Sequence, residues 1–251
     1  MACIVRGCRI GEGRPKVILP IVETSEEAIL ARGAEFSTLR ADCVEWRVDL
    51  WEEAADAPTL ERCLHGLRQV LGTKLLLVTF RTQAEGGQKP LSPEDYAALC
   101  RRVCASGCAD LLDLELLPTG AALPGLIREA HAAGVRVICS SHDFSGTPPR
   151  AELLARLEQM RQAGADIAKL AVMPRCREDL LELLSATTEM DRAHPELPLV
   201  TMSMGALGAV SRLWGEAMGS AMTFASVGKS SAPGQLELDL VNQVLDALRV
   251  G

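Results

Sequence analysis

One segment decides the fold class, and it reads RAELLARLEQMRQAGADIAKLAV (residues 150–172). Apolar residues recur with helical spacing over residues 150–163, which predicts an amphipathic helix. Gly164 stands where this helix should end, because glycine readily adopts the left-handed backbone that closes helices. The apolar run 166–172 follows at once and has the length of a buried strand. The segment therefore predicts a helix that leads directly into a strand.

The same alternation recurs along the whole chain. Strand-like runs lie at residues 16–22, 43–48, 74–80, 110–115, 135–140, 166–172, 199–204 and 221–227. Helical periods follow them at residues 25–34, 59–71, 93–105, 123–133, 150–163, 177–192, 209–218 and 236–248. Eight strand-then-helix units in about 250 residues are typical of an α/β protein with a closed (β/α)₈ TIM barrel.

A doubly wound open sheet is the structural alternative, but its first turn is usually rich in glycine. The first turn here, residues 22–25, has none. No linker or shift in composition divides the chain, so we expect one domain over residues 1–251. Residues 1–15 precede the first barrel strand, and we expect them to form a short hairpin that covers the bottom of the barrel.

Composition excludes several classes of function. Of 251 residues, 48% are apolar and 24% charged, which excludes a disordered chain. Aromatic residues make up 3%, the net charge is −7, and Lys and Arg do not cluster. These values argue against nucleic acid or an anionic membrane surface as a partner and leave a small molecule.

Localisation follows from apolar runs and cysteines. The longest uncharged stretch, residues 197–211, is shorter than the roughly 20 residues of a membrane span, and the N-terminus has no apolar secretory region. The nine cysteines are an odd number at irregular spacing. We expect reduced thiols and a cytoplasmic protein.

Charged residues occur at the ends of the predicted strands, where barrels place their chemistry. Glu45, Arg47 and Asp49 alternate along the second strand, so we expect all three to face the barrel interior, with Trp46 and Val48 facing the helices. Interior charges are costly without partners. The pattern therefore indicates either an active site or a buried network of ion pairs.

Two residues are candidates for catalysis. Lys169 lies in the middle of an apolar strand, where desolvation favours the neutral amine that attacks carbonyl carbons. A salt bridge to Asp113 or Glu45 is an equally good explanation of this lysine. His142 is the one histidine at a predicted strand end, which makes it the candidate general acid and base. We expect no metal, because the lysine and arginines would repel a cation.

The last two strands end in a candidate anion site. Arg212 follows the seventh strand and can hold a carboxylate with its planar guanidinium. The loop 228–235 is rich in glycine and small residues, and it can close over a ligand. A phosphate is the alternative ligand, because barrels often bind phosphate near the last two strands.

Seven blocks of sequence, in order at the strand ends, are similar to one family. They are Glu45-x-Arg47-x-Asp49, Phe80-Arg81 with Glu85-Gly86-Gly87, Asp113-x-Glu115, Ser141-His142-Asp143-Phe144, Ala168-Lys169, Met202-Ser203-Met204 with Ser211-Arg212, and Ser231-Ala232-Pro233-Gly234-Gln235. Together they resemble type I 3-dehydroquinate dehydratase over nearly all of the barrel.

The resemblance implies a hydro-lyase of the shikimate pathway, which leads to chorismate and the aromatic amino acids. It would convert 3-dehydroquinate to 3-dehydroshikimate by syn elimination through a lysine Schiff base. By position, Lys169 forms the imine, His142 is the general acid and base, and Glu85 orients His142. Arg212 would bind the substrate carboxylate, and the residues that would hold the ring hydroxyls and the closed loop are Glu45, Arg47, Arg81, Ser231 and Gln235. The resemblance also implies a homodimer, and the lysine needs no metal or organic cofactor.

Two other functions compete with this one. A class I aldolase would also use Lys169, but it would need a phosphate site in place of the carboxylate clamp at Arg212. A barrel that only binds a metabolite would be expected to lack Lys169 or His142, and both are present.

Overall fold

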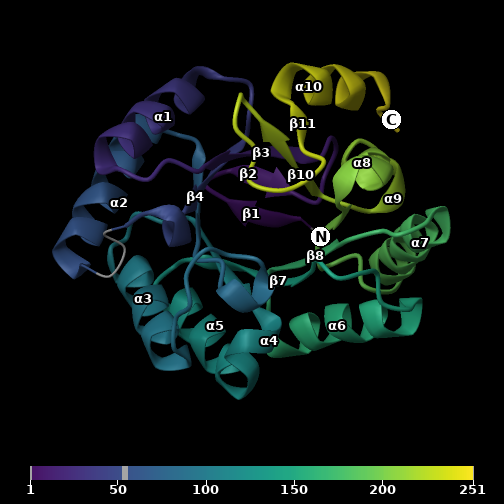
Figure 1. The fold of residues 1–251 in the computed structure, drawn as a ribbon, viewed down its shortest axis with the longest axis horizontal. Coiled ribbons are helices and arrows are strands. Elements are labelled where there is room, and N and C mark those ends of the chain that lie inside the picture. Colours follow the sequence, from purple (N-terminus) through teal and green to yellow (C-terminus); the bar gives the residue numbers. More distant parts are fainter. Residues whose placement is uncertain (1, 53–55, 251) are drawn as a thin grey trace.

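The computed structural model describes residues 2–52 and 56–250. Eight parallel strands pair in chain order, which confirms the predicted barrel. They are β3 (Lys16–Ile21), β4 (Cys43–Arg47), β5 (Leu75–Thr79), β6 (Leu111–Glu115), β7 (Arg136–Asp143), β8 (Ile167–Val172), β9 (Leu199–Ser203) and β10 (Met222–Ser226). The last strand, β10, returns to pair with β3. Figure 1 shows the helices arranged around these strands.

The barrel has one weak seam, between β9 and β10. The pairing there is a single bridge, Leu199 with Ser220, and the Ala221 N–H donates to the Leu199 carbonyl at 2.6 Å. A ninth strand, β11 (Leu236–Glu237), runs parallel to β10 and pairs with its C-terminal end. We call the end of the barrel where strands begin the lower rim and the end where they finish the upper rim.

The helices lie close to their predicted positions. They are α1 (Glu26–Thr38), α2 (Ala57–Leu71), α3 (Pro93–Ala105), α4 (Leu116–Thr119), α5 (Leu123–Ala132), α6 (Arg150–Ala163), α7 (Arg177–Ala193), α8 (Gly205–Gly208), α9 (Gly215–Met218) and α10 (Leu238–Ala247). Short 3₁₀ turns are η1 (Val48–Leu50), η2 (Gln83–Glu85), η3 (Gly120–Ala122) and η4 (Ala209–Arg212). Within the described residues, no helix is long and apolar enough to cross a membrane.

The prediction of one helix over residues 209–218 is wrong. This segment divides into η4 and α9 because Ser211 bonds backward to the end of β9: its hydroxyl accepts from the Ser203 N–H at 2.9 Å and donates to the Gly208 carbonyl at 2.7 Å. Such side-chain bonds compete with a continuous helix. A Cβ at position 208 would lie 2.2 Å from the Ser203 carbonyl oxygen, so the close approach requires glycine. The break turns Arg212 toward the barrel, where it is 2% exposed.

Two smaller differences occur at strand ends. Asp49 lies on the turn η1 and not on the strand, although it is fully buried as expected. The last helix begins at Leu238, because Leu236 and Glu237 form β11. The expectation of one domain over residues 1–251 stays a prediction.

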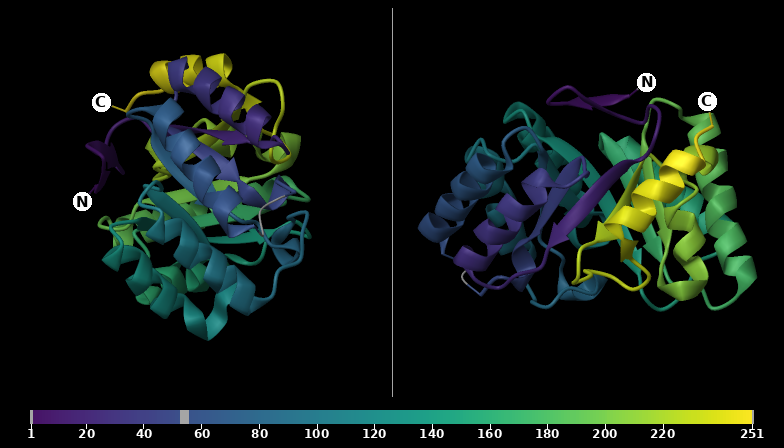
Figure 2. Two further views of the ribbon diagram at one scale, coloured as in Figure 1. Left: turned by 90° about the vertical axis from the view of Figure 1, so that its left-hand side faces the viewer. Right: turned by 90° about the horizontal axis from the view of Figure 1, so that it is seen from above.

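Two apolar cores hold the barrel together. The larger lies between strands and helices and includes Trp46 and Val48, as the alternation predicted. The smaller lies inside the barrel and extends from Ala171 and Met202 down to the first residues of the strands at the lower rim. The strands β1 (Cys3–Val5) and β2 (Cys8–Ile10) form an antiparallel hairpin, which packs Val5 and Ile10 into this smaller core. Figure 2 shows the hairpin lying across that end of the barrel.

The lower rim carries a fourfold pattern of hydrogen bonds. A side chain one or two residues before β4, β6, β8 and β10 accepts a backbone N–H near the start of the preceding strand. Asp42, Asp110 and Asp166 accept in this way from Val17, Leu76 and Val137, each at 2.8 Å, and Ser220 accepts from Thr201 at 3.1 Å. These four side chains pair backbone groups that would otherwise lose a partner where the strands begin.

Candidate active site

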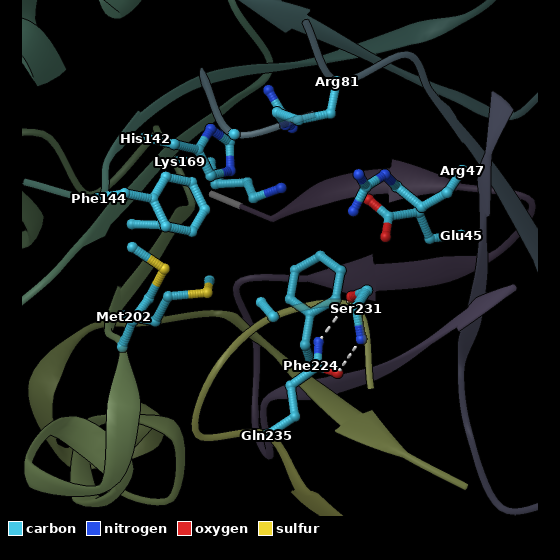
Figure 3. A pocket seen from close by; sticks show the side chains of 14 residues that line it. Glu45, Arg47, Arg81, His142, Phe144, Lys169, Met202, Phe224, Ser231 and Gln235 are labelled. Carbon is cyan, nitrogen blue, oxygen red and sulfur yellow. Dashed lines mark hydrogen bonds between the residues drawn. The ribbon is translucent and has the colours of Figure 1, made fainter. Parts of the chain in front are cut away.

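A pocket opens at the upper rim, on the inside of the barrel. The space inside it is about 470 Å³, which includes the part that is open to solvent. Charged, polar and apolar side chains from most of the strands line it together (Figure 3). They belong to Glu45, Arg47, Arg81, Gly86, His142, Phe144, Lys169, Ala171, Met202, Met204, Phe224, Ser231, Ala232 and Gln235.

Lys169 projects into this pocket from the middle of β8. Lys169 is 4% exposed. Its Nζ donates to Asp113 Oδ2 at 3.1 Å and lies 4.8 Å from the centroid of the Phe224 ring. The sequence left two explanations open, a reactive amine or a salt bridge to Asp113 or Glu45. The structure has the salt bridge to Asp113 and also exposes the lysine to the pocket. Glu45 instead accepts a hydrogen bond from Thr79 at 2.8 Å.

His142 and Glu85 form a buried pair beside Lys169. Glu85 Oε2 lies 2.8 Å from His142 Nδ1 and accepts the backbone N–H of His142 at 3.0 Å. When Glu85 is ionised it accepts from Nδ1–H, which leaves Nε2 as the basic nitrogen. The second oxygen of Glu85, Oε1, is buried without a hydrogen-bond partner. The geometry fixes the orientation of the ring.

Burial and neighbouring charges shift the pKa values of this pair. Burial, with help from the cations Arg81, Lys169 and Arg47, holds the pKa of His142 well below its usual range. The imidazole is therefore neutral at neutral pH, as a general base must be. Burial raises the pKa of Glu85 to about 8; Arg81 opposes the shift.

Arg81 organises the carboxylates behind the pocket. It donates to Glu115 at 2.7 Å, to Asp113 at 3.0 Å and to Ser140 at 3.1 Å. Although burial opposes its charge, these carboxylates raise the pKa of Arg81. Arg47 forms a bidentate salt bridge with Asp49, in which both hydrogen bonds are 2.8 Å long. The upper rim therefore holds the buried ion network that the sequence offered as an alternative, and the same network lines a pocket.

The turn that carries Glu85 depends on two glycines. Gly86 has a φ of +86°, and a Cβ there would lie 2.3 Å from the Phe144 ring. A Cβ at Gly87 would lie 1.8 Å from the Arg81 carbonyl oxygen. Because glycine has no side chain to make these clashes, this turn can fold back far enough for Glu85 to reach His142.

Arg212 does not line the pocket; it lies behind Met202. Its guanidinium donates to the Pro233 carbonyl at 3.0 Å and contacts the Met202 sulfur at 3.5 Å, and its Nε is buried without a partner. Burial lowers the pKa of Arg212 to about 10. No carboxylate of the described residues forms an ion pair with it, so this buried cation is available to an anion that enters beside Met202.

The loop after β10 lies over the pocket. Ser231 and Gln235 bond to each other at 2.8 and 2.9 Å, which holds both at the pocket wall (Figure 3). The Pro233 carbonyl also accepts from Gly205 at 3.2 Å. The loop thus joins Arg212 and α8 to the site.

Eight of the nine residues nominated from the sequence lie at or directly behind the pocket wall. Seven line it, Glu85 contacts His142, and Arg212 lies deeper. Sequence reasoning gave no role to the apolar half of the pocket, which consists of Phe144, Ala171, Met202, Met204 and Phe224. Alternation along the strands was the available signal, because Ala171 shares a face with Lys169 and Phe224 lies on an inward position of the last strand.

Among residues 2–52 and 56–250, no group of three or more His, Cys, Asp or Glu side chains could hold a metal ion. All nine cysteines lie within the described residues and are free thiols, and none of them, including Cys108 against His65, lines the pocket.

Comparisons with known proteins agree with this geometry. The family model described as type I 3-dehydroquinase matches residues 17–251. A 3-dehydroquinate dehydratase of Enterococcus faecalis is 46% identical over 242 residues, covering 96% of each chain. The crystal structure of a type I 3-dehydroquinate dehydratase from Clostridium difficile with covalently modified comenic acid has a TM-score of 0.95 at 39% identity, covering 99% of this chain and 98% of that one.

Proposed function

The chain belongs to the type I 3-dehydroquinase family, and we propose that its upper-rim pocket dehydrates 3-dehydroquinate to 3-dehydroshikimate. The protein is then a hydro-lyase of the shikimate pathway. One observation carries the proposal: a buried lysine, Lys169, shares a small pocket with a neutral His142 that contacts Glu85. The comparisons do not favour an aldolase or a non-catalytic barrel.

Lys169 begins the reaction by condensing with the C3 ketone of the substrate. The product is a protonated imine, which withdraws electrons and makes the adjacent C2 proton acidic. His142 removes that proton and returns a proton to the C1 hydroxyl, which leaves as water. Because one imidazole serves both carbons from one side, the elimination is syn. Water then hydrolyses the product imine and frees the lysine.

The other nominated residues would bind the substrate. Arg212 would take the carboxylate, and its lack of an ion-pair partner in the described residues supports this role. Met202 would have to move for direct contact, because it lies between Arg212 and the pocket. The ring hydroxyls would meet Glu45, Arg47 and Arg81, and the closed loop would contribute Ser231 and Gln235.

Trapping of the imine tests the proposal. The intact protein is treated with borohydride and 3-dehydroquinate, and its mass is then measured. We expect one ligand-derived adduct per chain, on the peptide that contains Lys169. The matched controls are Lys169→Ala, which should gain no mass, and a substitution of the exposed loop lysine, Lys229→Ala, which should behave as wild type. No adduct, or an adduct on another lysine, would contradict the imine mechanism.

We further propose a cytoplasmic homodimer that binds a small molecule and neither nucleic acid nor membrane. Nine free thiols support a reducing compartment, and the family resemblance supports the dimer. Light scattering of the purified protein would give a mass twice that of one chain. A monomer over a wide range of concentration would contradict this part.

A further inference from the structure

Asp113 divides its two oxygens between different kinds of partner. Oδ1 accepts from Arg81 at 3.0 Å and from Ser140 at 2.6 Å, two donors that are themselves buried. Oδ2 accepts from Lys169 Nζ at 3.1 Å. The carboxylate is 1% exposed, so water does not screen it. One oxygen therefore anchors the group while the other contacts the amine.

Other carboxylates near the pocket are already occupied. Glu115 accepts from Arg81 and from both the N–H and the hydroxyl of Thr82. Asp49 pairs with Arg47. Among the described residues, Asp113 is the carboxylate within ion-pair distance of Lys169.

Phe224 adds a second favourable contact for a cation at the same nitrogen. The Nζ atom lies 4.8 Å from the ring centroid, within the range at which an aromatic face attracts a cation. In Figure 3 the lysine points into the space between Arg81 and Phe224. The nitrogen thus has an anion and an aromatic face as neighbours before any substrate arrives.

A count of N–H bonds shows what these neighbours do during the reaction. An ammonium and a ketone give a protonated imine and one molecule of water, with no net exchange of protons. The C–N bond forms, the C–O bond breaks, and the nitrogen passes from three N–H bonds to one while it keeps its positive charge. We infer that Asp113 Oδ2 accepts this last N–H and that Asp113, with Phe224, is the catalytic counter-ion that keeps the imine protonated. The inference rests on the proposed function.

The counter-ion acts by charge and not by proton transfer. Burial opposes ionisation of Asp113, but Arg81, Lys169 and Ser140 outweigh it, and the pKa of this carboxyl is lowered. A carboxylate with a lowered pKa is a weak base, so Asp113 stays negatively charged. The proton remains on the imine nitrogen, where it is needed for electron withdrawal.

Other charged groups lie in or behind the same pocket, and the test must separate their effects from that of Asp113. They are Glu45 and Arg47 of β4, Arg81 after β5, Glu85 of η2, Glu115 of β6 and His142 of β7. Glu115 is the matched control, because it lies on the same strand, is equally buried and binds the same Arg81, but does not contact Lys169. Glu115 also raises the pKa of Glu85, and its effect is larger than that of Asp113.

The experiment measures how the protonated imine depends on pH. Wild type, Asp113→Asn and Glu115→Gln are incubated with 3-dehydroshikimate and cyanoborohydride, which reduces protonated imines, and the adduct is followed by intact mass between pH 5 and 10. Loss of a nearby opposite charge shifts a proton equilibrium by about 1–3 pH units. We expect the alkaline fall in Asp113→Asn to move down by this amount, and the alkaline fall in kcat to move with it. Glu115→Gln should move much less.

Each outcome decides the inference. A wild-type protein without an adduct overturns the imine and the counter-ion together. A wild-type adduct with an unmoved profile in Asp113→Asn, or an equal shift in Glu115→Gln, overturns the counter-ion alone. Circular dichroism shows whether Asp113→Asn folds. If it does not, Phe224→Leu decides instead: a smaller shift in the same direction supports the inference, and a wild-type profile overturns it.

Discussion

Carboxylates at the two rims of this barrel have different partners. At the lower rim, Asp42, Asp110 and Asp166 each accept a backbone N–H at the start of a strand. At the upper rim, Asp113, Glu115 and Glu85 lie near one another around a single arginine. The lower arrangement pairs groups that the fold leaves open, whereas the upper one brings like charges together. Acidic residues therefore pair with the backbone at one rim and with a buried arginine beside the pocket at the other.

The largest effect that would sharpen this comparison is on turnover at the upper rim. His142→Ala removes the proposed general acid and base but leaves Lys169, so we expect kcat to fall by at least about 10²–10⁴, the usual contribution of such catalysis. Borohydride should still trap an imine, and the melting temperature should change little. Near-normal kcat would mean that His142 only positions its strand and that another group moves the proton.

At the lower rim we expect the opposite response. Asp110→Ala leaves the Leu76 N–H without its acceptor, which costs about 1–3 kcal/mol for one orphaned group, and it also removes the ion pair of Arg68. Urea unfolding should show this loss, while kcat per folded molecule stays at the wild-type value. The matched variant Asp110→Asn keeps an acceptor oxygen and should lose less. A large fall in kcat in either folded variant would break the separation of the two rims.

Glu85→Gln tests whether an upper-rim carboxylate opposes folding. Because the pKa of Glu85 is raised from 4.5 to about 8, the folded protein holds a proton that the unfolded chain releases, and stability is lost as the pH rises through this window. Glutamine has no such proton to lose. We expect the variant to gain at least about 1 kcal/mol over wild type at pH 9, the equivalent of one pKa unit, and little at pH 5. Equal differences at the two pH values in thermal unfolding would refute this.

The smallest effect concerns the fourth lower-rim position, where a hydroxyl replaces the carboxylate. Ser220→Ala removes one neutral hydrogen bond to Thr201, which is worth about 0.5–1.5 kcal/mol. Chemical denaturation should therefore place this variant between wild type and Asp110→Ala. A loss greater than that of Asp110→Ala would mean that the β9–β10 seam depends on this hydroxyl more than the other junctions depend on their carboxylates.

Periodicity was enough to predict the barrel, because each strand and helix has its own pattern of apolar residues. It failed over residues 209–218, where the hydroxyl of Ser211 bonds to the end of β9 and ends the helix. That interaction joins residues eight positions apart, and no local pattern of apolar residues encodes it. The sequence does show an aspartate before alternate strands, at Asp42, Asp110 and Asp166. The role of these aspartates can be recognised only once it is known which strands are neighbours, because each one accepts an N–H from the adjacent strand.

Periodic patterns also predicted part of the site. Alternation placed Glu45, Arg47 and Lys169 on the inside of the barrel, and the family resemblance supplied their expected roles. The sequence did not show that a carboxylate and an aromatic ring would both lie beside Lys169. Asp113 and Phe224 are 111 positions apart in the sequence, and they come together only because the sheet closes into a barrel. Nor did it show that Arg212 would lie behind Met202.

The pairing of the first barrel strand with the last has a consequence for synthesis of the protein on the ribosome. Lys16 is opposite Met222, so β3 keeps one open edge until nearly the whole chain has been translated. At about 5–20 residues per second, that wait lasts roughly 10–40 s. An open strand edge is a place where nascent chains associate with one another. Codon choices that slow translation between β3 and β10 should therefore lower the soluble yield more than equal delays before β3 or after β10.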